Sequence, residues 1–106
     1  MTTTEQLIDH IRETIVPDKA RILRMRALAR ELACDVHDRT AAKLLVQRLN
    51  GAYLVLQLAT LSDDSQAMEF YRRECLSLVR AIDKGRGAPN DRPPETEAQS
   101  PVLAKR

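Results

Sequence analysis

The residues best suited to bind a charged ligand are five basic side chains that lie close together. Lys19, Arg21, Arg24, Arg26 and Arg30 fall within twelve positions that hold no acidic residue. Such a cluster can neutralise nucleic-acid phosphates. Projected on a helix, however, Lys19, Arg26 and Arg30 share one flank, whereas Arg21 and Arg24 lie well away from it. No aromatic side chain in this stretch could stack on a base. We therefore favour a basic surface that faces a protein, with nucleic-acid binding by residues 19–30 as the alternative.

A second pattern pairs an arginine with a histidine. Arg30 and His37 are seven residues apart, so they project from one helix face if the helix reaches His37. The segment 30–37, RELACDVH, resembles the motif of the HEPN family of small helical ribonucleases and nucleotide-binding proteins. That resemblance implies RNA cleavage that depends on His37. We prefer a simpler interpretation, in which His37 ends a helix where the dipole favours a cation.

Other chemistry finds little support in the residue types. His10, Asp9 and Glu13 could ligate a metal from one helix, but a di-iron bundle requires several inward Glu-x-x-His pairs, which this chain lacks. We expect these three side chains on a hydrated surface. Cys34 and Cys75 belong to no C-x-x-C pair, and we expect free thiols rather than a disulfide or a zinc site. Glycine-rich phosphate loops are also missing. We expect neither catalysis nor a cofactor.

The most informative stretch carries no charge at all. Residues 49–62 are uncharged, although charged residues make up 30% of the chain. On a helix, this stretch and its lead-in present two apolar stripes on opposite sides. The first stripe consists of Leu45, Leu49, Ala52, Tyr53, Leu56 and Ala59. The second consists of Leu54, Leu58 and Leu61. Because a short chain has few elements with which to cover both sides, the second stripe predicts contact with another chain.

These residues are positioned by helices. The first is expected over 4–16, because its apolar residues recur at helical spacing and Pro17 disfavours helix in the residue before it. Thr2 and Glu5 have the spacing of a capping box. Asp18 is a good N-cap for a second helix, whose apolar seam follows a 3-4-3-4 spacing.

Two further helices complete the pattern. A polar turn at 35–40 leads into a third helix, 40–61, which crosses Gly51. A glycine inside a helix costs about 1 kcal/mol relative to alanine, and close helix packing at Gly51 would offset that cost. The cap-forming residues 62–65 begin a fourth helix, with its apolar face toward the core and Gly85 as its C-cap.

The sequence therefore predicts an all-α protein: a small bundle of three long helices plus a shorter N-terminal helix, docked on the bundle or exchanged with a second chain. Residues 1–85 form the bundle, and the proline-rich segment 86–106 is a disordered tail. No stretch suits a membrane span or a secretory signal, so we expect a cytoplasmic protein.

The expected function is regulatory: binding and controlling another protein, as antiactivators and export chaperones do, with a homodimer built on the second stripe. The residues expected at protein interfaces are Leu54, Leu58, Leu61, Lys19, Arg26 and Arg30.

Overall fold

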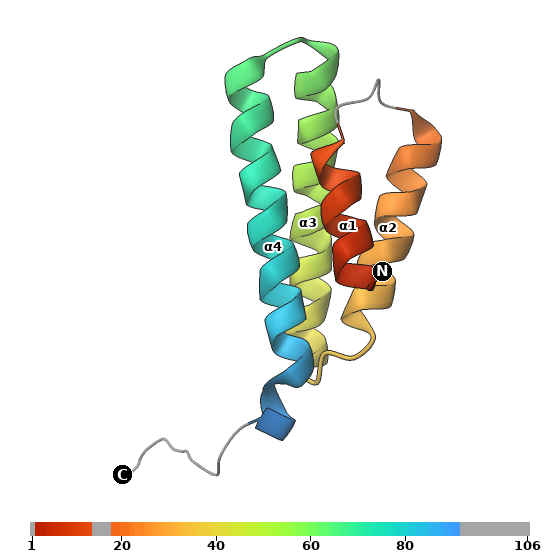
Figure 1. The fold of residues 1–106 in the computed structure, drawn as a ribbon, viewed down its shortest axis with the longest axis vertical. Coiled ribbons are helices and arrows are strands. Elements are labelled where there is room, and N and C mark those ends of the chain that lie inside the picture. Colours follow the sequence, from red (N-terminus) through yellow and green to blue (C-terminus); the bar gives the residue numbers. More distant parts are fainter. Residues whose placement is uncertain (1, 14–17, 92–106) are drawn as a thin grey trace.

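The computed structural model describes residues 2–13 and 18–91, and these fold into a bundle of four α-helices without a strand. The helices are α1 (Thr3–Arg12), α2 (Lys19–Ala33), α3 (Arg39–Leu61) and α4 (Ser65–Asp91). The three long helices alternate in direction, and the short α1 lies against them (Figure 1). The predicted all-α architecture is confirmed.

The helices begin where capping side chains satisfy free backbone N–H groups. Thr2 and Glu5 form the predicted capping box: the Glu5 N–H donates to Thr2 Oγ1 over 3.1 Å, and the Thr2 N–H donates to Glu5 Oε1 over 2.8 Å. Asp18 caps α2, as predicted. Asp38 and Asp64 accept in the same way at the starts of α3 and α4.

Two helix ends differ from the prediction. The first helix ends at Arg12 rather than at residue 16, because Glu13 adopts an extended conformation with φ −65° and ψ 131°. Pro17, the expected stop, lies outside the described residues. The fourth helix continues past Gly85 to Asp91. A Cβ at Gly85 would lie 3.3 Å from Val36 Cγ1, so this glycine allows α4 to approach the α2–α3 turn instead of ending the helix. The predicted disordered tail covers residues 86–106; residues 86–91 are instead helical, as the last part of α4, and residues 92–106 lie outside the described part.

The third helix is continuous through Gly51, as predicted, but the expected reason is wrong. A Cβ built on Gly51 meets nothing within 4 Å. No helix therefore packs closely there, and the cost of the glycine is not offset by packing of the described residues. The residues on both sides of Gly51 are helical and keep α3 continuous at this position.

The core consists of apolar side chains from all four helices, and it contains the predicted faces of α3 and α4. The fully buried members with the largest side chains are Leu7, Ile11, Met25, Leu32, Leu49, Tyr53, Cys75, Val79 and Ile82. Burial raises the pKa of the Cys75 thiol to about 12, so Cys75 behaves as a core residue, as expected.

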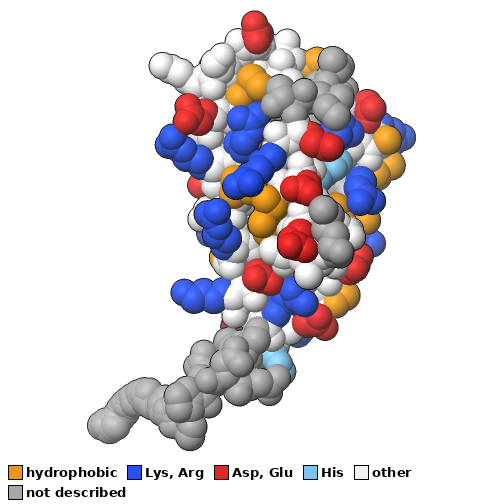
Figure 2. Space-filling model, viewed as in Figure 1, with side chains coloured by type: hydrophobic (Ala, Val, Ile, Leu, Met, Phe, Trp, Pro, Cys, Tyr) orange, Lys and Arg blue, Asp and Glu red, His pale blue; other side chains and the backbone are white. Residues whose placement is uncertain are grey.

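The short α1 docks on its own chain. It packs against α2 and α4. Thr3 Oγ1 donates to Glu31 over 2.9 Å, and Thr4 Oγ1 donates to Asp83 over 3.0 Å. The face that carries α1 is covered largely by charged and polar side chains (Figure 2). Helices α2 and α4 flank α3, and α1 packs on the same two helices at the position diagonally opposite α3. One side of α3 therefore has no helix of the described chain over it.

Candidate protein-interaction face

The three leucines of the second stripe lie on this uncovered side of α3. Leu54 is 42% exposed, Leu58 61% and Leu61 65%. They border a groove of about 460 Å³ between α2 and α3, which we call the leucine groove. Its lining residues from α2 are Lys19 and Ile22, and those from α3 are Leu54, Gln57, Leu58 and Leu61. The predicted second stripe is therefore an exposed apolar surface and not part of the intramolecular core.

The wall of the leucine groove also contains a buried amide. Gln57 is only 8% exposed, and its Oε1 atom has no hydrogen-bond partner among the described residues. Two helical turns earlier on the same side of α3, the Oδ1 atom of Asn50 is also buried and has no hydrogen-bond partner among the described residues. An unmade hydrogen bond of a buried polar atom costs about 1–3 kcal/mol.

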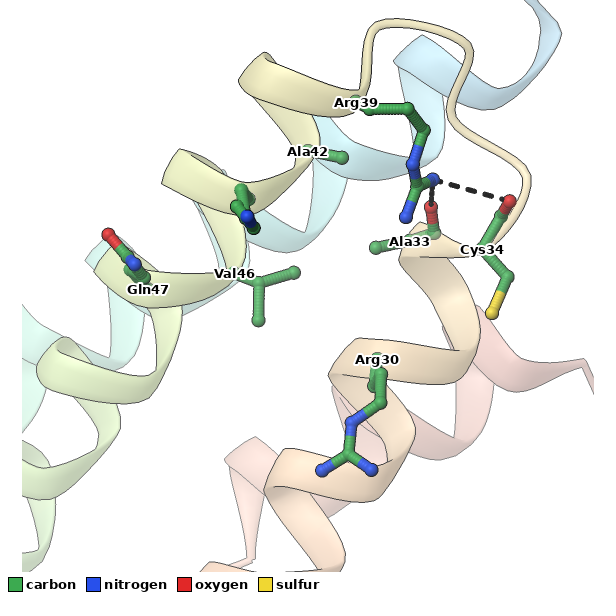
Figure 3. A pocket seen from close by; sticks show the side chains of 8 residues that line it. Arg30, Ala33, Cys34, Arg39, Ala42, Val46 and Gln47 are labelled. Carbon is green, nitrogen blue, oxygen red and sulfur yellow. Dashed lines mark hydrogen bonds between the residues drawn. The ribbon is translucent and has the colours of Figure 1, made fainter.

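A second hollow, of about 190 Å³, lies between the same two helices near the C-terminal end of α2 (Figure 3). Arg30 projects from α2 and Lys43 from α3, while Ala33, Ala42 and Val46 add apolar surface. No acidic residue of the described chain lines it. We call it the cationic pocket.

Arg39 also borders the cationic pocket, but its guanidinium is already engaged. Its Nη1 donates to the carbonyl oxygens of Ala33 and Val36 over 2.8 and 3.1 Å, with a longer contact of 3.4 Å to that of Cys34. These bonds close the C-terminal end of α2, where carbonyl groups lack helical partners. The charge available to a ligand therefore comes from Arg30 and Lys43, neither of which pairs with a described acidic residue.

The structure gathers the predicted interface residues from two helices onto one surface. Lys19 lies with the leucines and Arg30 lines the cationic pocket. Arg26 is exposed and falls between them on the flank of α2 that helical spacing assigns to all three. We call the leucine groove, Arg26 and the cationic pocket together the α2–α3 face.

The other two arginines of the basic cluster lie elsewhere, as the helical projection predicts. Arg21 Nη2 lies 3.1 Å from the Glu13 carboxylate and donates to the His10 carbonyl oxygen over 3.0 Å. Arg24 lines a different hollow, with Asp9 and Glu13. The cluster of five is therefore divided, and Arg21 serves the packing of α1 on α2.

The Arg30–His37 pattern does not meet its geometric condition. Helix α2 ends at Ala33, so His37 is in the following turn and shares no helix face with Arg30. The simpler interpretation fails for the same reason, because His37 lies beyond the last turn of α2. His37 is exposed.

A buried polar cluster around His10 was missed by the sequence analysis, which placed His10 on a hydrated surface. His10 is 6% exposed. Its Nε2 donates to the Arg21 carbonyl oxygen over 2.9 Å and lies 3.2 Å from the Tyr53 hydroxyl. Burial is the main cause that lowers the pKa of His10, and burial also raises the pKa of Tyr53. The only sequence signal was the position of His10 three residues after Leu7, beside the apolar face.

A rival apolar surface lies on the other flank of α3. Val55 and Phe70 border a groove between α3 and α4, and Phe70 is 60% exposed. The charged residues at this groove, Arg48 and Glu74, face each other with N and O 4.0 Å apart. Its charges are thus balanced within the chain, whereas the cations of the α2–α3 face have no described acidic partner.

The described residues offer neither a metal site nor a membrane span. No group of three or more potential metal ligands occurs in residues 2–13 and 18–91. Within the same residues, no helix has the length and apolar character of a membrane span. Comparison with known proteins gives no family model that matches the chain, and no significant match to a curated protein or a solved structure.

Proposed function

We propose that this protein binds another protein through its α2–α3 face and controls it by that binding. The observation that carries the proposal is the leucine groove, in which three exposed leucines lie beside the buried, unpaired acceptor of Gln57. Soluble proteins seldom leave such apolar patches open unless they serve binding. In a partner complex, the leucines would lose water contact.

The energy available from this surface is sufficient for an interface. Complete burial of a leucine contributes roughly 1.5–3 kcal/mol. Leu54, Leu58 and Leu61 are each 35–58% covered already, so only the remaining exposed part can contribute. Even with that reduction, three adjacent leucines can form the centre of a small interface, since a few residues supply most of the binding energy.

In this proposal, the protein controls its partner by covering a segment of it. A segment of the partner held in the groove is withheld from its other contacts, which is how antiactivators and chaperones act on their targets. The proposed role needs no catalysis and no cofactor. The homodimer expected from the sequence is a competing proposal for the same leucines, and sedimentation of the purified chain distinguishes it.

The test compares two equally exposed apolar residues on the two flanks of α3. Full-length tagged chain with Leu58→Arg, and a matched control with Phe70→Arg, are expressed in the source cell beside the unchanged protein, and the retained proteins are identified by mass spectrometry. We expect a partner retained by the unchanged protein and by Phe70→Arg and lost with Leu58→Arg. Retention by Leu58→Arg, with its circular dichroism unchanged, would contradict the proposal.

Nucleic-acid binding is the second candidate, because Lys19, Arg26, Arg30 and Lys43 lie on one face without described acidic partners. Binding of this kind predicts that affinity falls steeply with salt and is lost when Arg26 and Arg30 are both replaced by glutamate. It gives the leucine groove no role. Binding of RNA or DNA that survives Leu58→Arg and fails in the charge variant would favour this second function.

A further inference from the structure

Resting on the proposed function, we infer the chemistry of the partner segment: an amphipathic helix whose apolar side chains fill the leucine groove while its carboxylates lie over Arg30 and Lys43. The leucine groove has three exposed leucines and one cation, Lys19, whereas the cationic pocket has Arg30 and Lys43 over a smaller apolar floor. An occupant that matches both ends carries most of its apolar side chains at the first and its carboxylates at the second. Such a segment has one apolar end and one acidic end.

The register of the face suits a helix. Lys43, Leu54 and Leu61 lie within about 20° of one another around α3, since they are separated by nearly whole numbers of turns. The rise from Lys43 to Leu61 is about 27 Å, the length of a helix of about 18 residues. A helix laid along a groove between two helices presents anchors at every third and fourth position. The two hollows lie where such a helix would place anchors near its ends.

The charge at one end selects carboxylates. Arg30 and Lys43 stand on opposite walls of the cationic pocket, one from each helix, and Arg39 is held by backbone carbonyls behind them. Asp18 is the acidic residue that borders the leucine groove at the other end of the face, and its Oδ1 accepts from the Arg21 N–H over 2.8 Å. An acidic side chain over the pocket therefore meets two cations, whereas a basic one meets repulsion.

The apolar floor distinguishes a peptide from a polyanion. Ala33, Ala42 and Val46 surround the two cations, and Ile22 with the leucines continues the apolar surface toward the other end. The phosphates of a nucleic acid would contact the cations but would gain no binding energy from this apolar floor. An amphipathic helix uses both the floor and the cations.

The experiment uses two synthetic helical peptides of about 18 residues with one leucine pattern, matched to the length of the face. One peptide carries glutamates at its acidic end, and the other carries lysines at the same positions. Binding of each to the full-length chain is measured by fluorescence anisotropy at low and high salt. We expect the glutamate peptide to bind roughly fivefold more tightly at low salt, with the difference shrinking at high salt as the charges are screened.

Variants assign that preference to residues. Arg30→Glu with Lys43→Glu should remove or reverse the preference, whereas the control Arg80→Glu with Lys84→Glu, at exposed cations of α4, should keep it. Leu58→Arg, or the milder Leu58→Ser, should weaken both peptides. Equal binding of the two peptides, weakened alike by Leu58→Arg, would overturn the acidic-helix inference while the proposed protein-binding function stands.

Three other outcomes overturn the inference in distinguishable ways. Binding of neither peptide, or binding indifferent to Leu58, contradicts the proposed function as well. A chain that sediments as a dimer and becomes a monomer with Leu58→Arg identifies a second copy as the occupant. Displacement of the glutamate peptide by a short RNA, at the same salt, shows that the cations serve a nucleic acid.

Discussion

Two polar side chains on adjacent turns of α3 differ in how fully the chain satisfies their polar atoms. Tyr53 is 2% exposed, and its hydroxyl lies 3.2 Å from His10 of α1, inside a cluster of hydrogen bonds. Gln57, one turn further on, is 8% exposed, and its Oε1 has no partner among the described residues. Tyr53 belongs to the core cluster and reaches α1. Gln57 also lines the leucine groove, where Leu58 and Leu61 are more than half exposed.

This difference separates the buried cluster around His10 and Tyr53 from the exposed α2–α3 face. The region around His10 and Tyr53 is a buried core, with buried leucines and hydrogen-bonded polar groups. The α2–α3 face combines exposed apolar groups, cations without a described acidic partner and an amide oxygen without a hydrogen bond among the described residues.

The largest effect should come from Leu49→Ala. Leu49 is fully buried, so the loss of its side chain leaves a cavity and should lower the free energy of unfolding by roughly 2–5 kcal/mol. Leu58→Ala on the same helix should change it by no more than about 0.5 kcal/mol. Urea denaturation followed by circular dichroism measures both. Similar losses for the two variants would show that Leu58 is part of the core.

The buried polar cluster around His10 should make the free energy of unfolding decrease as the pH falls. His10 has a lowered pKa when folded, mainly through burial, and an ordinary value of 6.5 when unfolded. As the pH drops through about 6.5, the unfolded chain takes up a proton that the folded chain resists, so stability declines until the folded pKa is reached. Urea midpoints at about pH 7.5 and 5.5 should differ less for His10→Gln than for the unchanged chain. An equal difference in both would remove His10 as the cause.

Gly51 offers a smaller change, and in the stabilising direction. An added Cβ meets nothing within 4 Å, and alanine is favoured over glycine inside a helix, so Gly51→Ala should raise the free energy of unfolding by about 0.5–1 kcal/mol. The control is Gly85→Ala, where the new Cβ would approach Val36 Cγ1 to 3.3 Å. A gain as large at Gly85 as at Gly51 would contradict the packing described for α4.

The smallest effect is expected from the tail. Removal of residues 92–106 should leave the melting temperature almost unchanged, because a proline-rich, weakly apolar segment contributes little to a core. Thermal unfolding of the full chain and of the chain ending at Asp91 provides the comparison. A loss of several degrees would show that Val102 and Leu103 contact the bundle.

Much of the fold followed from local signals. The caps at Thr2 and Asp18, the continuity of α3 and the buried faces of α3 and α4 all depend on residues near one another in sequence. The helix ends were harder to predict. Gly85 has the local pattern of a C-cap, but Val36, far away in the sequence, accounts for it.

The candidate site was predictable in its parts and not in its assembly. The exposure of Leu54, Leu58 and Leu61 was expected from helical spacing alone. That Lys19 would line the same groove required the antiparallel packing of α2 on α3. The contact of His10 with Tyr53 joins residues 43 positions apart, and no local pattern encodes it.

The central claim is that a partner occupies the α2–α3 face, and site-specific photocrosslinking in the source cell tests it most directly. A photoreactive phenylalanine analogue replaces Leu58 in one full-length chain and Phe70, of nearly equal exposure, in another. We predict a discrete crosslinked species of higher mass from position 58 after illumination and none of comparable yield from position 70. Equal yields at the two positions, or a product at position 70 alone, would contradict the claim.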